Sequence, residues 1–447
     1  MPPTDYVSAQ PAAIGLRASL PELATAFSYA LDAAEGREPG HAVKLTYIAG
    51  LLADELDCST AERRSVFYGA LLHDVGVPSA ASALARSAGL DEELIFGFAP
   101  LSDLTAAEVP PDQIRQATRV LRAHVANGSA LLGHPWFPEG TRAAVQASHE
   151  NWDGSGYPAS RRGEDIPLEG RIVRAADLFD CVVSAESNPL SARSEGRALI
   201  RRWAGREIQP EIAEALRGLA DDDVFWLGLY DDAVGRRLIA EAPESIPPSG
   251  ALLRGFSQAV ADLADSKAGH QLGRAGRVVG YVTAMADQLG IEGERAQRLA
   301  LAALWNDVGT FGVPGRILGK PDLLSLDEMK RMRFHPAFSA EIISRIAVLE
   351  PAAHWVGAHH ERIDGRGYPE MLSGAAIPLE AGLLSLADAY VAMTSPRPYR
   401  NQLSPEDALS VVQAGAGSQW DSYLVQVFFE VLGAEPVQAE PLRATSA

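Results

Sequence analysis

Apolar residues recur at spacings of three and four along most of this chain, which is the period of helices that bury one face. The pattern predicts a series of helices in the N-terminal half, and the C-terminal half repeats the series. We expect the first series at residues 20–34, 41–56, 60–73, 114–132, 141–149 and 172–185. Residues 224–230 suit either a closing helix or a short strand. The expected fold is therefore all-α.

The repeat is clearest in an eleven-residue segment, which occurs at residues 148–158 and again at 359–369. Tyr157 and Tyr368 within the segment keep an offset of 211, and two pairs outside it keep the same offset: His124 with His335, and Asp177 with Asp388. Upstream, Asp74 and Asp307 differ by 233, so the first copy carries 233 − 211 = 22 extra residues. Most of this insertion should lie within residues 79–114.

The repeat and the length of 447 residues predict two tandem helical bundle domains, each with its own core, because one core rarely serves so long a chain. We expect the first domain at residues 16–241 and the second at 251–433. A proline-containing linker at 242–250 should join them. The two ends, residues 1–15 and 434–447, are expected to be disordered and flexible.

Charge and composition exclude several classes of partner. The formal net charge of −19 argues against broad binding to nucleic acid or to an anionic membrane, since such surfaces need clustered Lys and Arg. The chain has 2 cysteines without metal-type spacing and no apolar stretch of about 18 residues. We therefore expect a cytoplasmic protein without a disulfide framework or a membrane span.

Imidazoles and carboxylates of the first copy suggest metal chemistry. The candidate ligands are His41, His73, Asp74, His124, His149 and Asp177. This mixture suits divalent iron, manganese or zinc, and a carboxylate can bridge two such ions. Neighbouring helical residues diverge by about 100°, so His73 and Asp74 can both face a centre between helices. The pattern predicts a metal site in the first copy.

An early histidine, a His-Asp pair, a further histidine, the segment His-Glu-x-x-Asp-Gly-x-Gly-Tyr-Pro and a final Ala-Asp resemble the HD-GYP branch of the HD phosphohydrolase superfamily. The resemblance covers nearly the whole chain, twice. It implies an all-helical fold and a centre of two or three metal ions that hydrolyses cyclic dinucleotides, most often cyclic di-GMP. It places metal ligands at the six candidates, with Asp74 in the bridging role and with His73 and Asp74 as the catalytic pair. The implied cofactors are two divalent ions, iron or manganese first, with zinc, nickel and magnesium as alternatives.

The first copy departs from the family pattern at several positions. Ser148 stands where the family usually has a histidine, so one imidazole of the second metal is lost. Arg37 occupies the place, one turn before His41, where some members carry an acidic ligand for a third metal. We therefore expect at most two ions. A lysine that the family carries after the His-Asp pair is replaced by Val77 here and by Thr310 in the second copy.

The second copy has lost more of its metal ligands. Arg274 aligns with the early histidine, and Asn306 replaces the histidine of the His-Asp pair. The residues left for one ion are Asp307, His335, His359, His360 and Asp388. A cationic Arg274 beside that ion should lower its affinity by repulsion between like charges.

Basic residues show the opposite distribution between the copies. The second copy keeps Lys320, Arg397 and Arg400, which resemble the phosphate-binding elements of the family. The first copy has Glu186 and Pro189 opposite the two arginines, and a carboxylate there should repel a dinucleotide. The first copy thus predicts metal binding, and the second predicts phosphate binding.

The Gly-Tyr-Pro loops allow two interpretations. The glycines can permit tight turns with positive φ while the tyrosines pack the loops down, or the loops can recognise a signalling protein. The residues concerned are Gly154, Gly156, Tyr157, Gly365, Gly367 and Tyr368.

Three hypotheses about function follow from these observations. The first is a metal-dependent phosphodiesterase that hydrolyses a cyclic dinucleotide, or another nucleotide, at a binuclear centre in the first domain. The second is a weakly active or inactive signalling protein that binds a nucleotide or a protein partner through its second domain. The third is a purely structural module. The expected partners are a nucleotide, a signalling protein at the Gly-Tyr-Pro loops and a second copy of the chain in a homodimer.

Overall fold

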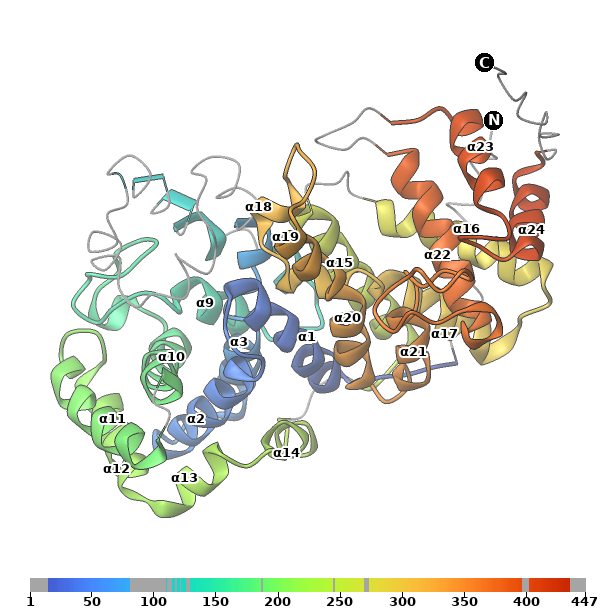
Figure 1. Cartoon of the computed structure of the whole chain (residues 1–447). Coiled ribbons are helices and arrows are strands. Elements are labelled where there is room, and N and C mark those ends of the chain that lie inside the picture. Colours follow the sequence, from blue (N-terminus) through green and yellow to red (C-terminus); the bar gives the residue numbers. More distant parts are fainter. Residues whose placement is uncertain are drawn as a thin grey trace, which may run out of the picture.

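The structure of the chain is a computed structural model, and it is helical throughout its described part (Figure 1). It describes residues 15–80, 110, 115–116, 119–120, 122–125, 129–185, 188–243, 246–268, 273–395 and 402–434. Within these residues, β pairing is limited to isolated bridges such as that between Ala18 and Ser249. The prediction of an all-α fold is confirmed. Arg397, Arg400, Glu186, nearly all of the predicted insertion, and residues 1–14 and 435–447 of the expected disordered ends lie outside the described residues.

The helices predicted at 20–34, 41–56, 60–73, 141–149 and 172–185 begin and end within four residues of the predicted positions. Much of the helix predicted at 114–132 lies outside the described residues. The described elements of the first half are α1 (Leu20–Glu35), α2 (His41–Glu55), α3 (Thr60–Leu71), α8 (Ser129–Leu132), α9 (Glu139–Ala147), η2 (Gly163–Asp165), α10 (Leu168–Ala185), α11 (Pro189–Trp203), α12 (Pro210–Asp221), α13 (Asp223–Leu229) and α14 (Val234–Ala240). Capping boxes start two of them, since Ser19 and Ser59 each pair with a glutamate three residues later. The segment that suited a helix or a strand is the helix α13.

The second half repeats this series of helices. Its elements are α15 (Gly250–Lys267), α16 (Arg274–Gln288), α17 (Gly293–Trp305), η3 (Val308–Gly312), α18 (Gly315–Leu318), α19 (Leu326–Arg333), α20 (His335–Ser344), η4 (Glu350–Ala352), α21 (Ala353–Gly357), η5 (Gly374–Ala376), α22 (Leu379–Met393), α23 (Pro405–Gly415) and α24 (Ser422–Leu432). The helices α10 and α22 begin 379 − 168 = 211 residues apart. Equivalent residues of the two halves can therefore be compared directly.

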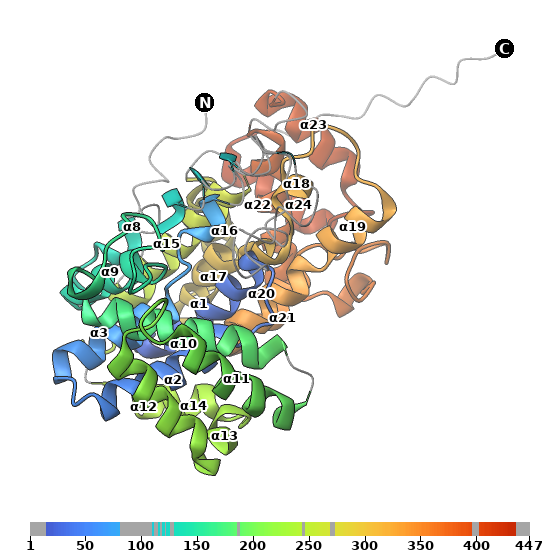
Figure 2. The ribbon, with the colours of Figure 1, turned by 90° about the vertical axis from the view of Figure 1, so that its left-hand side faces the viewer.

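The two halves share a hydrophobic core, which corrects the expectation of two separate cores. Helix α1 lies where the halves meet (Figure 1; Figure 2), and the ring of Phe27 packs 6.0 Å from Phe256 and 5.8 Å from Phe311. One apolar cluster runs from α1 through the second half, and another is confined to the first half. Periodicity shows which face of a helix is apolar, but it does not show which helix covers that face.

Among the described residues, no helix combines the length and the apolar character that a membrane crossing needs.

Candidate metal centre

The first imidazole of the centre is held by a carboxylate that the sequence analysis did not single out. His41 is the first residue of α2, and its Nδ1 lies 2.6 Å from Oδ2 of Asp180 on α10. This bond directs Nε2 of His41 toward Asp177, whose Oδ1 lies 3.7 Å away. A carboxylate behind a metal-binding imidazole fixes its tautomer and its orientation. Asp180 is therefore a positioning residue for His41.

The His-Asp pair lies in a turn and not within a helix, because α3 ends at Leu71. Nδ1 of His73 donates to the carbonyl of Ala70 at 2.9 Å, since a carbonyl can only accept. Nε2 of His73 then lies 2.7 Å from Oδ2 of Asp74. The predicted helix 60–73 is thus too long by two residues, and the turn brings both side chains toward one centre.

Asp74 also faces the two remaining imidazoles. Its Oδ1 lies 3.6 Å from Nε2 of His124 and 3.6 Å from Nε2 of His149. These two nitrogens are 3.2 Å apart. Two nitrogens that bind one tetrahedral ion at about 2.05 Å are separated by about 3.3 Å. The three groups therefore have the spacing of ligands to a common ion.

Several buried ligand atoms of this cluster face only one another and have no hydrogen-bond partner outside the cluster among the described residues. They are Nε2 of His41, Nε2 of His73 and both carboxylate oxygens of Asp74. Buried polar atoms without partners are costly, so native proteins normally satisfy them. Their side chains belong to two groups of candidate ligands, Glu35 with His41 and His73, and Asp74 with His124 and His149. Metal ions in these groups would satisfy the buried atoms, and the donor sets fit them.

The charges of the cluster also suit a cation. Burial raises the pKa of Asp74, but His73 and the two neighbouring imidazoles outweigh it and hold the pKa well below the usual value. Burial lowers the pKa of His149 to about 4. The carboxylate is therefore ionised and His149 is neutral at neutral pH, which are the forms that bind metal. Burial lowers the pKa of His73, but Asp74 outweighs it and raises that pKa to about 10, so a metal ion must displace a proton from His73.

Glu35 is a further candidate ligand that sequence reasoning missed. It is the last residue of α1, and one of its oxygens can lie within 4.8 Å of nitrogens of both His41 and His73. Its Oε1 pairs with Nε of Arg37 at 2.8 Å, while its Oε2 is buried without a hydrogen bond. Arg37 occupies the place of an acidic ligand, as the sequence indicated, but the carboxylate of Glu35 lies beside it. The only sequence signal was an acidic residue just before the helix-ending Gly36.

A second arginine near the centre was also missed. Arg174 on α10 donates from Nη1 to Asp177 at 3.1 Å and from Nε to Asn151 at 3.1 Å. Cys181 donates to the other oxygen of Asp177 at 3.2 Å. Arg174 therefore places positive charge beside Asp177. The sequence comparison considered only Glu186 and Pro189 and did not reveal this charge.

Ser148 occupies the position of the lost imidazole without reaching the centre. Its hydroxyl donates to the carbonyl of Val145 at 2.9 Å. In the second half, Nδ1 of His359 donates to the equivalent carbonyl of Val356. Ser148 thus keeps the orienting hydrogen bond and lacks the nitrogen that would bind metal.

The Gly-Tyr-Pro loop supports the centre directly. Tyr157 stacks on His149 with ring centroids 4.9 Å apart. The carboxylate of Glu150 accepts from the backbone N–H groups of Ala159 at 2.7 Å and Arg161 at 3.1 Å, which holds the loop closed. The second half keeps this arrangement, with Tyr368 stacked on His360 at 4.9 Å.

The loop glycines serve two different purposes. Gly154 and Gly365 have φ values of +82° and +74°, as predicted. Gly156 and Gly367 do not have positive φ, which corrects that part of the prediction. A Cβ on Gly156 would instead lie 2.3 Å from the backbone nitrogen of Asn151. This glycine is required by close approach of the backbone and not by its own conformation.

Comparison with known proteins agrees with this geometry. A family model described as "HD domain" matches residues 106–210 and 258–424, together more than half of the chain. The chain belongs to the HD domain family. The predicted resemblance to the HD phosphohydrolase superfamily, whose members are metal-dependent, is confirmed.

The relatives of this HD domain protein are cyclic dinucleotide phosphodiesterases. A 3′3′-cGAMP-specific phosphodiesterase of Vibrio cholerae is 27% identical over 420 residues, which cover 88% of this chain and 90% of the relative. A cyclic di-GMP phosphodiesterase response regulator of Xanthomonas campestris is 38% identical over 152 residues, which cover 34% of this chain and 39% of the relative. A crystal structure of a cyclic GMP-AMP specific phosphodiesterase of V. cholerae has a TM-score of 0.67 and 25% identity, and covers 94% of this chain and 99% of that one.

In the second half, Arg274 stands at the position that His41 has in the first half. Arg274 is buried and bonds Asp307 through Nη1 and Asp388 through Nη2. Asp388 therefore faces the guanidinium and does not join the imidazoles with which the sequence grouped it. A cavity of 660 Å³ lies beside these groups. Lys320 lines the cavity, and its ammonium pairs with Glu328 at 2.6 Å.

Acidification should destabilise the metal-free protein through His149. Its pKa of about 4 in the folded chain lies below the unfolded value of about 6.5, so the unfolded chain takes up the proton first. Stability from this group is complete above pH 6.5 and is lost as pH falls toward 4. Between pH 7 and pH 5 the loss is about 2 kcal/mol. Urea unfolding of chelator-treated protein at the two pH values measures this fall in the free energy of unfolding. In His149→Asn the fall should be smaller than in wild type by about the same 2 kcal/mol. Equal losses in both proteins would contradict the assignment.

Proposed function

We propose that the first half is a metal-dependent phosphodiesterase that hydrolyses a cyclic dinucleotide at a centre of two divalent ions. The observation that carries the proposal is that buried ligand atoms of His41, His73 and Asp74 have no partner outside the cluster of imidazoles and carboxylates. The relatives, which are phosphodiesterases for 3′3′-cGAMP and cyclic di-GMP, support the substrate class. Because imidazole is mixed with carboxylate, iron or manganese is the favoured metal.

The ligands divide into two groups around one carboxylate. His41, His73 and Asp177 lie on one side of Asp74, and His124 and His149 lie on the other. When bound, the ions would supply an activated water at neutral pH and would stabilise charge on the phosphoryl oxygens. Asp74 lies between the two groups and has an oxygen facing each, which is the arrangement a bridging carboxylate needs.

Residues behind the ligands hold them in position for this chemistry. Asp180 orients His41, and the carbonyl of Ala70 orients His73. Tyr157 covers one face of His149. Preorganised groups avoid the cost of reorientation during the reaction. Hydrogen bonds and ring contacts thus fix the orientation of the ligand side chains, in addition to the positions that the backbone gives them.

Arg174 is proposed to bind a phosphate of the substrate. It is half-buried beside Asp177 and has no equivalent arginine in the second half, where Ser385 occupies the position 211 residues later. Loss of a charge-assisted hydrogen bond costs about 1.5–3 kcal/mol, which corresponds to roughly a 10- to 100-fold fall in kcat/KM. Arg174→Ala should show this fall mainly as a higher KM, and Arg174→Lys should recover part of it.

Arg217→Ala provides the matched control for Arg174, because Arg217 forms exposed surface ion pairs that contribute little. Steady-state kinetics of the three variants decide the question. If Arg174→Ala keeps the KM of wild type, the arginine does not contact the substrate.

The substrate class is tested with a panel of nucleotides. Protein loaded with Mn²⁺ or Fe²⁺ is incubated with 3′3′-cGAMP, cyclic di-GMP, cyclic di-AMP and a cyclic mononucleotide, and products are separated by chromatography. We expect hydrolysis of at least one cyclic dinucleotide and its loss on addition of chelator. Metal-loaded protein that leaves every nucleotide of the panel intact would contradict the proposal.

The cavity of the second half supports a second candidate function, nucleotide binding without cleavage. Arg274 and Lys320 line the cavity and can face an anionic ligand. Both are already paired with carboxylates, so an entering phosphate must displace Glu328 from Lys320. Calorimetric titration with a cyclic dinucleotide tests this candidate, and Lys320→Ala should weaken the binding about tenfold. Identical titrations of the two proteins would remove its support.

A further inference from the structure

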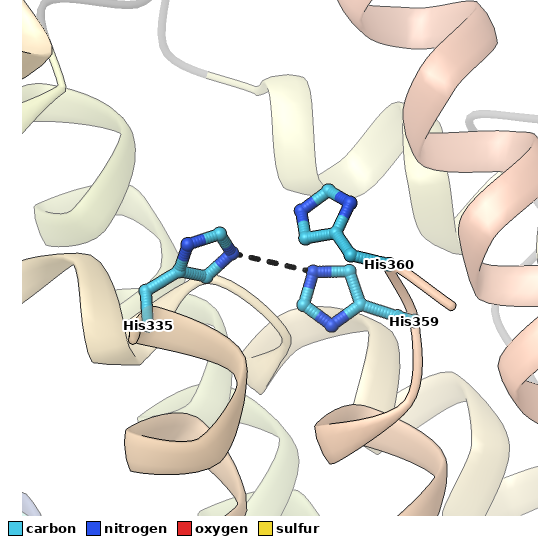
Figure 3. A group of neighbouring side chains, drawn as sticks. All are labelled: His335, His359 and His360. Carbon is cyan, nitrogen blue, oxygen red and sulfur yellow. Dashed lines mark hydrogen bonds between the residues drawn. The ribbon is translucent and has the colours of Figure 1, made fainter. Parts of the chain in front are cut away.

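Three imidazoles meet in the second half, those of His335 and of the adjacent pair His359 and His360. His335 begins α20, and His359 and His360 follow the end of α21 (Figure 3). Nδ1 of His335 lies 2.8 Å from the carbonyl of Met332, and Nδ1 of His359 lies 2.5 Å from the carbonyl of Val356. Because a carbonyl oxygen can only accept, each Nδ1 carries a hydrogen. In the neutral rings, both Nε2 atoms are then bare acceptors.

These two bare nitrogens face each other at 3.4 Å. Two acceptors at this distance repel unless a cation lies between them. Two nitrogens bound to a tetrahedral ion at about 2.05 Å are about 3.3 Å apart, so the observed separation is that of two ligands to one ion. A nitrogen of His360 completes a set whose ligand atoms lie within 4.8 Å of one another.

Asp307 connects the imidazoles to Arg274. One of its oxygens bonds the guanidinium, and the other, Oδ1, lies 3.5 Å from Nε2 of His335. The second nitrogen of the guanidinium bonds Asp388. In the first half, the place of Arg274 belongs to His41 and the places of the two aspartates belong to Asp74 and Asp177.

The guanidinium therefore pairs with Asp388 and with one oxygen of Asp307. The other oxygen of Asp307 remains available on the side of the imidazoles. Arg274 and one divalent ion bring 1 + 2 = 3 positive charges to these aspartates, whereas two divalent ions bring 4. By this count, a centre with Arg274 and one ion carries less positive charge than a centre with two divalent ions. The expected loss of affinity from Arg274 is offset by Asp307 and Asp388, which it contacts directly.

We propose that the second half binds a single transition-metal ion through His335, His359 and His360, with Arg274 permanently replacing a second cation. Asp307 is shared between the guanidinium and the ion. Three imidazoles and one carboxylate favour zinc, cobalt or divalent iron over magnesium and calcium. Asp307 and His360 also line the 660 Å³ cavity, so a ligand in the cavity can reach the ion. The proposal goes beyond hydrolysis in the first half and does not depend on it.

Cobalt is the probe that tests this site in the full-length chain. The triple variant His41→Ala, Asp74→Ala, His149→Ala breaks each ligand group of the first centre, and Co²⁺ is then titrated while visible absorption and metal content are measured. We expect one tightly bound Co²⁺ per chain. Adding His360→Ala should weaken its binding at least about tenfold, and adding His354→Ala, an exposed histidine of the same half, should leave it unchanged. No bound Co²⁺, or binding that is indifferent to His360, overturns the proposal.

The role of Arg274 is tested by restoring the ligands of the first half. In the same background, Arg274→His with Asn306→His should raise the stoichiometry from one Co²⁺ to two. Thermal unfolding establishes that each variant is folded before its metal is counted. A folded variant that still binds one ion shows that Arg274 does not stand in the place of a cation. Because hydrolysis is not measured, these outcomes are independent of the activity proposed for the first half.

Discussion

Replacing Asp74 by asparagine is expected to lower cyclic dinucleotide hydrolysis by about a thousandfold or more, because this carboxylate faces both groups of ligands. The amide that replaces it is neutral and cannot bridge two cations. Metal content should fall together with kcat, while KM should change little among the molecules that retain metal. Initial rates and elemental analysis of the same preparation measure both effects.

Asp265→Asn is the matched control for Asp74→Asn. Asp265 is also a buried aspartate, but it lies in the second half, and burial raises its pKa to about 6. Its oxygen accepts from the backbone N–H of Ala275, and an asparagine oxygen can accept the same bond. Turnover by this variant should stay within about twofold of wild type. A similar loss of activity in both variants would mean that the effect at Asp74 is general destabilisation.

Gly156→Ala is expected to destabilise the protein by about 3 kcal/mol or more and to reduce metal binding in the first half. The new Cβ would meet the backbone of Asn151 at 2.3 Å and the carbonyl oxygen of His149 at 2.5 Å, so the loop must move. Because Tyr157 stacks on His149, movement of the loop displaces a metal ligand. Thermal unfolding and metal content measure the two consequences.

Gly50→Ala separates this effect from the general cost of changing a glycine. Gly50 lies within α2 with open space around the position of a Cβ. Alanine should stabilise the helix there by about 0.5–1 kcal/mol. If Gly156→Ala has the stability and metal content of Gly50→Ala, the close approach at Gly156 does not constrain the loop.

The helical fold and much of the centre follow from local patterns in the sequence. Apolar spacing predicts α2 at residues 41–56, and the observed helix is His41–Glu55, because burial of one face determines both the period and the extent. The His-Asp pair and the later histidines converge as the resemblance implied. Their polar side chains stand out among apolar neighbours, so these residues can be recognised in the sequence alone.

Other features depend on contacts between distant segments, which local patterns do not encode. Glu35 reaches His41 and His73 because α1 ends beside α2 and α3, and a sequence shows no such meeting of helices. Arg274 illustrates the same limit, since its alignment with a histidine predicts a lost ligand but not two ion pairs with opposing carboxylates. Packing decides which carboxylate each cation meets.

Hydrolysis in ¹⁸O-labelled water tests the account most directly. Metal-loaded protein is incubated with 3′3′-cGAMP and with cyclic di-GMP, and the products are weighed by mass spectrometry. We predict a linear dinucleotide with one ¹⁸O in its terminal phosphate, since the attack on phosphorus is by water. Intact cyclic substrates after incubation with protein that contains its full complement of metal would contradict the assignment of the first half as a phosphodiesterase.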